Sequence, residues 1–330
     1  MTSLSTTYLG LKLRSPIVVS ACTLSEDLDN ILKMEDAGAG AVVMFSMFEE
    51  QIRKEEALME NIMKSTTNVF AEASDFFPDL DEYHVATGKY LETIRTAKER
   101  VNIPIIGSLN GITPKGWIDY GKQLEQAGAD ALEINIFFIP ADVRLSGIDV
   151  EQRYLDIIRL MKQTVSIPIA VKMNPYFSAM GHMALQMQDA GADGLVLFNR
   201  FYQPDFDIQQ LKVIHDIQFS EANEIRLPLL WIAILSGQIK ASLAATTGVQ
   251  SAHEVIKYLL AGADVTMTAS ALYKNGIAYI ALMERVLRQW MDSMRFLSLD
   301  DFRGSMNQSN ISDPTAYERA NYIRILEGIK

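Results

Sequence analysis

Four copies of the phrase Ala-Gly-Ala recur along the chain, each closing a helical stretch and leading into a short apolar run. The copies begin at Ala37, Ala127, Ala190 and Ala261, and the runs read AVVMFSM, ALEINIF, GLVLFN and DVTMTAS. A glycine just past a helix end takes the left-handed backbone conformation at little steric cost. Each copy is therefore typical of a helix-to-strand junction, and the repetition predicts a fold built from such units.

A second phrase alternates with the first and places a proline at the start of an apolar run. It occurs at Ser15-Pro16, Ile103-Pro104 and Ile167-Pro168. Proline is tolerated at the first residue of a strand because its missing N–H need not join the ladder. The alternation predicts eight strands, at about residues 16–20, 41–46, 103–108, 131–136, 168–172, 194–199, 241–246 and 264–269.

Short apolar strands that alternate with helices predict a parallel sheet with right-handed crossovers. Eight such strands indicate an α/β fold of the closed (β/α)8 TIM-barrel type. An open, doubly wound sheet with extra strands is the alternative. The seventh strand is the most ambiguous, because residues 228–235 read as a strand or as a helix with Pro228 at its first position and Gly237 just past its end. We expect the helix there and the strand in 241–246.

Three segments exceed a minimal barrel: residues 47–90 after the second strand, 200–227 after the sixth and 277–330 after the eighth. The first begins with a charged helix candidate, and the last is expected to be helical. The first two leave from the C-terminal face, where barrels carry their active sites, so we expect them to cover the site. No linker divides the chain, which predicts one domain over 1–330 with a barrel core of about 7–293 and a helical tail of about 294–330.

Composition narrows the classes of partner. The formal net charge of -11 argues against nucleic acid and anionic membranes as partners. Cys22 is the single cysteine of the sequence, which fits a reducing compartment. The first residues lack the apolar region of a signal peptide, and apolar runs such as 227–235 are too short to span a membrane. We therefore expect a cytoplasmic protein.

Polar side chains end several of the expected strands. In a barrel these ends meet at one mouth, and the set comprises Asn110, Asn135, Lys172, Asn199 and Arg200. Such groups suit hydrogen bonding to a heteroaromatic ring. Lys172 is the most unusual, because it interrupts the apolar run IPIAVKM, although a solvated strand end is the alternative.

The turns after the last two strands resemble a phosphate site. Thr247, Gly248, Ala269 and Ser270 offer backbone N–H groups from small residues. Barrels commonly bind phosphate in these two turns, although ordinary turns use the same residue types.

Other chemistries find little support. The histidines have no metal-ligand spacing, and they are His84, His182, His215 and His253. The sequence has no GxSxG, P-loop or HExxH motif. Glu133 lacks an evident second carboxylate for glycoside hydrolysis, and we interpret Cys22 as a small residue in a tight loop.

The strand ends resemble the dihydroorotate dehydrogenase family of FMN-dependent barrels, from about residue 7 to about 293. The matching phrases are TTYLGLKLRSPIVVSA, IPIIGSLNG, ALEIN, IPIAVKMNPYF, LFN, TTGVQSAHEVIKYLLAGADV and ASALYKNG. The resemblance implies FMN as cofactor, with Ser20 and Ala21 under the flavin and Asn110 and Asn135 near its ring or ribityl side. It also implies Lys172 at the flavin N1/O2 edge, where a cation stabilises reduced flavin. The phosphate would be held by Thr247, Gly248, Ala269 and Ser270, and the substrate would contact Asn199 and Arg200.

The sequence departs from the family in the substrate half of the site. Phe138 stands where the family has the Cys or Ser base, and phenylalanine accepts no proton. Phe45 replaces a lysine after the second strand, and Arg200 replaces a Ser or Thr after the sixth. The catalytic base is therefore unknown. Candidates for a substitute are Ser46, Asp142, Arg144, Ser146 and Tyr176, which the sequence does not rank.

Several functions stay open at this level. The first is an FMN-dependent oxidoreductase acting on a CH–CH bond, with dihydroorotate oxidation to orotate in pyrimidine biosynthesis as the family default. A variant keeps FMN but takes another small substrate in a more apolar pocket made by Phe45, Phe137 and Phe138. A catalytically silent flavin-binding subunit and an aldolase or isomerase with Lys172 as Schiff-base nucleophile are the alternatives. We expect a small, planar, anionic substrate, a soluble electron acceptor and, as in related proteins, a homodimer.

Overall fold

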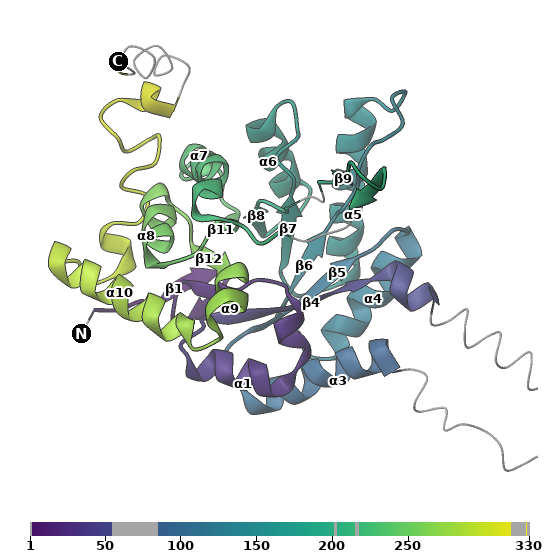
Figure 1. The fold of residues 1–330 in the computed structure, drawn as a ribbon, viewed down its shortest axis with the longest axis horizontal. Helices are drawn as coiled ribbons and strands as arrows, with labels where there is room; N and C mark the ends of the chain where they lie inside the picture. The colour runs from purple at the N-terminus through teal and green to yellow at the C-terminus, as the bar shows by residue number, and fades with distance from the viewer. Residues whose placement is uncertain (1, 55–84, 201–202, 215–217, 318–327, 329–330) are drawn as a thin grey trace, which may run out of the picture.

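The computed structural model describes residues 2–54, 85–200, 203–214, 218–317 and 328. Eight parallel strands close into a barrel, seen near the centre of Figure 1, which confirms the TIM barrel and excludes the open sheet. In barrel order the strands are β3 (Ile17–Val19), β4 (Ala41–Phe48), β5 (Ile105–Asn110), β6 (Ala131–Asn135), β7 (Ile169–Met173), β8 (Gly194–Leu197), β11 (Ser242–Ala245) and β12 (Val265–Thr268).

Helices surround the strands in Figure 1 and bury apolar side chains towards the barrel, with α10 packed on α8 and α9. Their bounds are α1 (Leu28–Asp36), α3 (Val85–Arg100), α4 (Pro114–Gln126), α5 (Gly147–Thr164), α6 (Met180–Asp189), α7 (Arg226–Leu235), α8 (Ala252–Ala261), α9 (Ser270–Asn275) and α10 (Tyr279–Met294). A short 3-10 helix, η1 (Thr23–Glu26), follows β3.

The Ala-Gly-Ala phrases form the predicted junctions. They follow α1, α4, α6 and α8, and their glycines have φ values of 104°, 95°, 113° and 109° at Gly38, Gly128, Gly191 and Gly262. The prolines also behave as expected. Pro16, Pro104 and Pro168 directly precede β3, β5 and β7, and their carbonyl groups accept hydrogen bonds from neighbouring strands.

The helix expected over 228–235 and the strand expected in 241–246 are confirmed by α7 and β11. The expected start of that helix is wrong. Pro228 is the third residue of α7, because the 3-10 helix η3 (Ala222–Ile225) runs directly into the helix at Arg226.

Two apolar cores hold the barrel. One lies between the strands and the helices. The other fills the barrel interior and includes Tyr8, Leu9 and Leu13 of an N-terminal hairpin, β1 (Thr6–Tyr8) and β2 (Leu11–Leu13). Leu9 donates its N–H to Ser242 Oγ at the start of β11, so the hairpin covers the N-terminal end of the barrel. The C-terminal end is left for a ligand.

The structure describes fewer residues of the excursion after the second barrel strand than of the one after the sixth. Residues 49–54 are helical, and the rest of the charged helix candidate lies outside the described residues. After β8 the chain forms an antiparallel hairpin, β9 (Asp205–Asp207) and β10 (Lys212–Ile214), before η3.

The helical tail expected from residue 294 is wrong for its described part. Residues 295–317 contain only the 3-10 helices η4 (Leu299–Asp301) and η5 (Pro314–Tyr317). The physical reason is that the N–H groups of Gly304 and Met306 bond the carbonyls of Leu259 and Leu260 at the end of α8. The last carbonyls of a helix lack i+4 partners within it, and that of Leu259 also accepts the N–H of Gly262 just past the helix end. Within the described ranges, no helix is both long and apolar enough to cross a membrane.

Candidate active site

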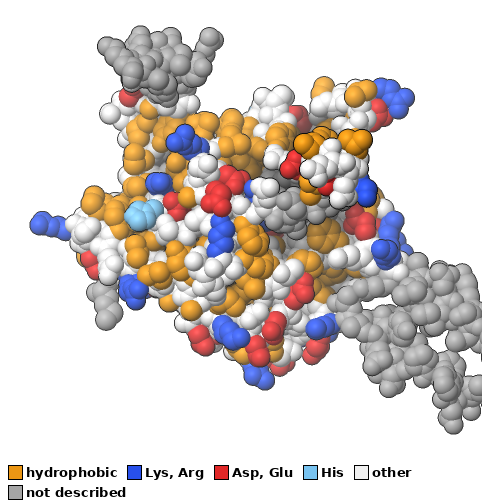
Figure 2. Space-filling model, viewed as in Figure 1, with side chains coloured by type: hydrophobic (Ala, Val, Ile, Leu, Met, Phe, Trp, Pro, Cys, Tyr) orange, Lys and Arg blue, Asp and Glu red, His pale blue; other side chains and the backbone are white. Residues whose placement is uncertain are grey.

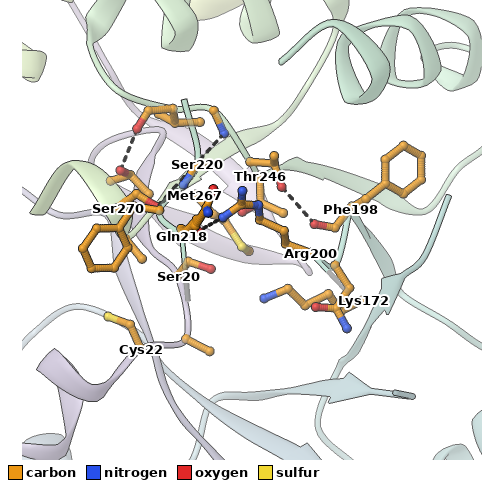
Figure 3. Close-up of a pocket in the computed structure, with 18 of the residues that line it drawn as sticks. Ser20, Cys22, Lys172, Phe198, Arg200, Gln218, Ser220, Thr246, Met267 and Ser270 are labelled. Carbon is orange, nitrogen blue, oxygen red and sulfur yellow. Dashed lines mark hydrogen bonds between the residues drawn. The ribbon is translucent and has the colours of Figure 1, made fainter. Parts of the chain in front are cut away.

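A cavity of about 680 Å³ opens at the C-terminal end of the barrel. This lies within the roughly 300–1,000 Å³ of small-molecule and cofactor sites. Most of the sequence-predicted site residues line it, namely Ser20, Ala21, Lys172, Asn199, Arg200, Thr247, Gly248, Ala269 and Ser270. They come from the ends of five strands, β3, β7, β8, β11 and β12, and Figure 3 shows several of them around the cavity.

The barrel places these side chains by alternation. Ala131, Ala170 and Val265 belong to the interior cluster at the start of their strands. Since side chains of a strand alternate between its faces, Glu133 and Lys172 face inward as well, nearer the mouth. The interior thus changes from apolar to polar towards the cavity.

Lys172 is the cation at the base of the cavity. Only 9% of the residue is exposed, and its Nζ lies 3.3 Å from Oε1 of Glu133, which is 1% exposed. The second oxygen of Glu133, Oε2, has no hydrogen-bond partner among the described residues. Lys172 is therefore a buried ion-pair partner, and the alternative of a solvated strand end is excluded.

The asparagines are only partly brought together. Asn199 lines the cavity and donates from Nδ2 to Oδ1 of Asn135 at 2.7 Å. Asn135 is in register with Lys172 across β6 and β7 but, among the described residues, is not part of the cavity wall. Asn110 ends β5 beside Phe48, is 5% exposed and also lies outside that wall.

The two turns expected to bind phosphate lie side by side. Thr247 and Gly248 both have left-handed backbones, with φ of 77° and 75°. From behind, the buried Tyr258 of α8 donates its hydroxyl to the Thr247 carbonyl at 2.8 Å. Ser220, from the excursion after β8, accepts a hydrogen bond from Gly248 N–H at 3.3 Å and donates to Ser270 Oγ at 3.1 Å. An oxygen acceptor thus already sits between the turns.

Arg200 reaches into the cavity and is held by the same excursion (Figure 3). Its guanidinium donates to the Gln218 carbonyl, and its Nε lies 3.2 Å from Oε2 of Glu224. These contacts fix the strap from Gln218 to Ser220 over the cavity.

Phe137 and Phe138 point in different directions. Phe137 lines the cavity, whereas Phe138 is not among the described residues of its wall and stacks under Arg153 of α5, 4.3 Å from its guanidinium carbon. Phe45 lies 6.4 Å from Phe48, ring to ring, and is likewise outside the wall. Of the three phenylalanines expected to form an apolar pocket, Phe137 therefore lines the cavity and the other two do not.

None of the substitute bases lines the cavity among the described residues. Ser46 is buried and bonds Ser108 Oγ at 2.7 Å inside the barrel. Ser146 caps α5, and Tyr176 is largely exposed. Hydrogen bonds from Arg144 lower the pKa of the exposed Asp142, which makes it a weaker proton acceptor.

Several cavity residues were missed by the sequence reasoning. Gln203, Pro204, Asp205, Gln218, Phe219 and Ser220 belong to the excursion after β8, and Tyr273 belongs to α9. The rings of Phe219 and Tyr273 stack at 5.0 Å. Cys22 also lines the cavity, but burial raises the pKa of its thiol and opposes a nucleophilic thiolate. The only signal for the strap was the length of the loop.

Metal ligation finds no support in the described part of the chain, where no cluster of three or more His, Cys, Asp or Glu side chains could hold an ion. His84 and His215 lie outside the described residues.

Comparison with known proteins identifies the family to which the chain belongs. A family model described as dihydroorotate dehydrogenase matches residues 80–291. The catalytic subunit of dihydroorotate dehydrogenase B (NAD(+)) of Thermoplasma acidophilum is 24% identical over 92% of this chain and 99% of its own length. The corresponding subunit of Methanocaldococcus jannaschii is 24% identical over 83% of this chain and 88% of its own. That of Shouchella clausii is 26% identical over 62% and 68%. The chain therefore belongs to the dihydroorotate dehydrogenase family, a family of dehydrogenase enzymes.

Proposed function

We propose that this protein is an FMN-dependent oxidoreductase that acts on a CH–CH bond of a small, planar, anionic substrate. The observation that carries the proposal is the buried ammonium group of Lys172 at the base of the cavity. The turns at Thr247-Gly248 and Ala269-Ser270 border the same cavity and suit a phosphate group. An ammonium beside a flavin stabilises the negative charge that reduction places on it.

The donor set fits FMN. Ser220 Oγ accepts a hydrogen bond from the Gly248 N–H and donates one to Ser270 Oγ, so the backbone of the first turn already presents a donor to an oxygen acceptor. Ser20 and Ala21 offer a small-residue surface at the end of β3 for a flat ring. When bound, FMN would supply the acceptor for the hydride that leaves one substrate carbon, and the proton from the neighbouring carbon would pass to water at the cavity mouth. Asn199 would orient the substrate, and the strap from Gln218 to Ser220 borders the cavity.

We propose that the substrate differs from dihydroorotate. Phe138 stands at the family's base position, and its ring stacks on Arg153 rather than entering the cavity wall. A positioned base contributes about 10²–10⁴-fold to such a reaction. Phe137, on the wall, favours an apolar face on the substrate. The relatives' description as catalytic subunits further suggests that electrons leave through a partner chain.

The first test is the absorbance spectrum of the purified protein, followed by titration of apoprotein with FMN. Bound flavin with shifted absorption is expected, and failure to take up FMN would overturn the proposal. Anaerobic mixing with dihydroorotate is then expected to bleach the flavin slowly or not at all. Rapid bleaching would instead identify dihydroorotate as the substrate. Retention of a substrate adduct on Lys172 after borohydride treatment would favour the Schiff-base alternative.

A further inference from the structure

Glu133 and Lys172 form a buried ion pair, but the proposed reaction uses only the lysine and leaves the carboxylate without a role. Glu133 sits on β6 with 1% of its surface exposed, and it does not line the cavity among the described residues. Lys172 on β7 does line it. Since Ala170 is the strand partner of Glu133, the carboxylate arises one inward layer further from the mouth than the lysine.

Among the described residues, Lys172 is the one cationic side chain that pairs with Glu133. The strand partner on the other side is Ser108, whose hydroxyl is bonded to Ser46 Oγ at 2.7 Å. The phenols of Tyr8 and Tyr90 are the other titratable groups nearby, and burial and, to a lesser degree, the charge of Glu133 raise the pKa of both. The Oε2 atom has no hydrogen-bond partner among the described residues. A carboxylate in such a place costs desolvation free energy that a packing role alone does not require.

We propose that Glu133 is a positioning residue that anchors Lys172 and offsets its charge, and so limits how strongly the site favours reduced flavin over oxidised flavin. The ammonium group alone would draw electron density onto a bound flavin. With a carboxylate 3.3 Å away, the pair presents little net charge to the cavity. Removing the carboxylate while keeping its shape exposes the full charge of Lys172. The inference rests on the proposed function, because it assigns FMN to this cavity.

The first measurement needs no cofactor and uses the full chain without FMN. Lys172→Met leaves Glu133 buried without a counter-charge and is expected to lower stability strongly in urea unfolding. Adding Glu133→Gln to Lys172→Met is expected to restore part of that loss, so the two substitutions are not additive. Additive effects would overturn the pairing itself.

The second measurement is the two-electron midpoint potential of the FMN-loaded protein, obtained by equilibration with a reference dye. Glu133→Gln is expected to favour binding of reduced over oxidised FMN by tenfold or more, equal to about 30 mV or more towards positive potential. Glu133→Asp keeps the charge and is expected to stay near the wild-type potential. Glu49→Gln is the matched control, because Glu49 is an equally buried carboxylate outside the cavity wall.

The outcomes are distinguishable. Wild-type protein that takes up no FMN overturns the proposed function and, with it, the effect of Glu133 on the flavin potential. The urea unfolding of the Lys172 and Glu133 variants still tests whether the two residues form a pair. Protein that binds FMN but shows equal potentials for wild type and Glu133→Gln overturns the effect on the potential alone. If Glu133→Gln shifts the midpoint potential in the positive direction, and this shift disappears when Lys172→Met is also present, the proposed effect of Glu133 on the flavin potential is supported.

Discussion

Single side chains decide how the two halves of the cavity differ. On the cofactor side, Lys172 and the small residues of the two turns line the wall. On the substrate side, the family's base position carries Phe138, which stacks on Arg153. The replacement of the family's base by Phe138 therefore does not place a phenylalanine ring in the described cavity wall.

Restoring the family's base at position 138 tests this point. Because Phe138 lies outside the described cavity wall, Phe138→Cys is expected to raise the rate of flavin bleaching by dihydroorotate by less than about 10²-fold, the lower range for a positioned base. Anaerobic stopped-flow absorbance measures the rate. Phe138→Ala is the control for loss of the ring, and a larger gain specific to cysteine would show that position 138 reaches the substrate.

Two buried tyrosines give opposite predictions for stability. Tyr8 is fully buried in the barrel interior, and its hydroxyl has no partner among the described residues. Such a group costs about 1–3 kcal/mol, so Tyr8→Phe is expected to raise the free energy of unfolding by about 1 kcal/mol. Tyr154 donates to the Ile136 carbonyl at 2.9 Å and accepts from Asn174, so Tyr154→Phe is expected to lower it by about 1–2 kcal/mol. Urea unfolding measures both, and equal signs would contradict the assignment.

At the level of elements, Glu49 links the segment after β4 to the start of α4. Its carboxylate accepts hydrogen bonds from the N–H groups of Ile112 and Thr113, and from the Thr113 hydroxyl. A Cβ at Gly116 would lie 2.3 Å from this carboxylate, so the approach needs glycine. The contact fixes the loop between β5 and α4 at the barrel mouth.

This contact predicts a pH dependence. Burial acts to raise the pKa of Glu49, but the hydrogen bonds from Thr113 and Ile112 and the charge of Arg53 outweigh it and lower the pKa. A depressed folded pKa gives stability that is present above the unfolded value, about 4.3, and is lost as pH falls through the folded value. Glu49→Gln is expected to cost about 2 kcal/mol at pH 7. Relative to wild type, the difference should shrink between about pH 5 and pH 3.

Urea unfolding across this pH range makes the comparison. Glu92→Gln is the control, because Glu92 pairs with Arg95 on an exposed surface, where ion pairs contribute about 0–1 kcal/mol. A difference that is constant with pH would show that Glu49 acts by shape and not by charge.

At the level of the whole molecule, apolar side chains gather on the β9–β10 hairpin beside the cavity mouth (Figure 2). Phe206, Ile208 and Leu211 are 65%, 84% and 88% exposed. Side chains of this size on one short hairpin are typical of an interface. They support the expected homodimer, which stays a prediction, as do the cytoplasmic location and the single-domain organisation over 1–330.

The hairpin provides the test of the dimer. Wild-type protein is expected to elute as a dimer in size-exclusion chromatography with light scattering, and Ile208→Asp with Leu211→Asp is expected to give a monomer. Leu297→Asp is the control, because Leu297 is 76% exposed after α10, away from the mouth. A monomeric wild type, or a dimer that survives the hairpin substitutions, would contradict the interface.

The sequence alone determined the barrel. Left-handed glycines, strand-opening prolines and apolar periodicity act over a few residues, so the eight strands and α7 could be read locally. Most of the site residues predicted from the strand ends also line the cavity, because parallel strands in a barrel deliver their ends to one mouth.

Only the tertiary structure decided how those side chains are used. The pairing of Lys172 with Glu133 depends on inward layers of two neighbouring strands, and the outward turn of Phe138 depends on Arg153 of α5. Ser220 reaches the phosphate turns from a distant loop, and the tail after α10 follows the ends of α7 and α8 instead of forming an α-helix. Each outcome is a contact between different elements of the fold, which local periodicity does not encode.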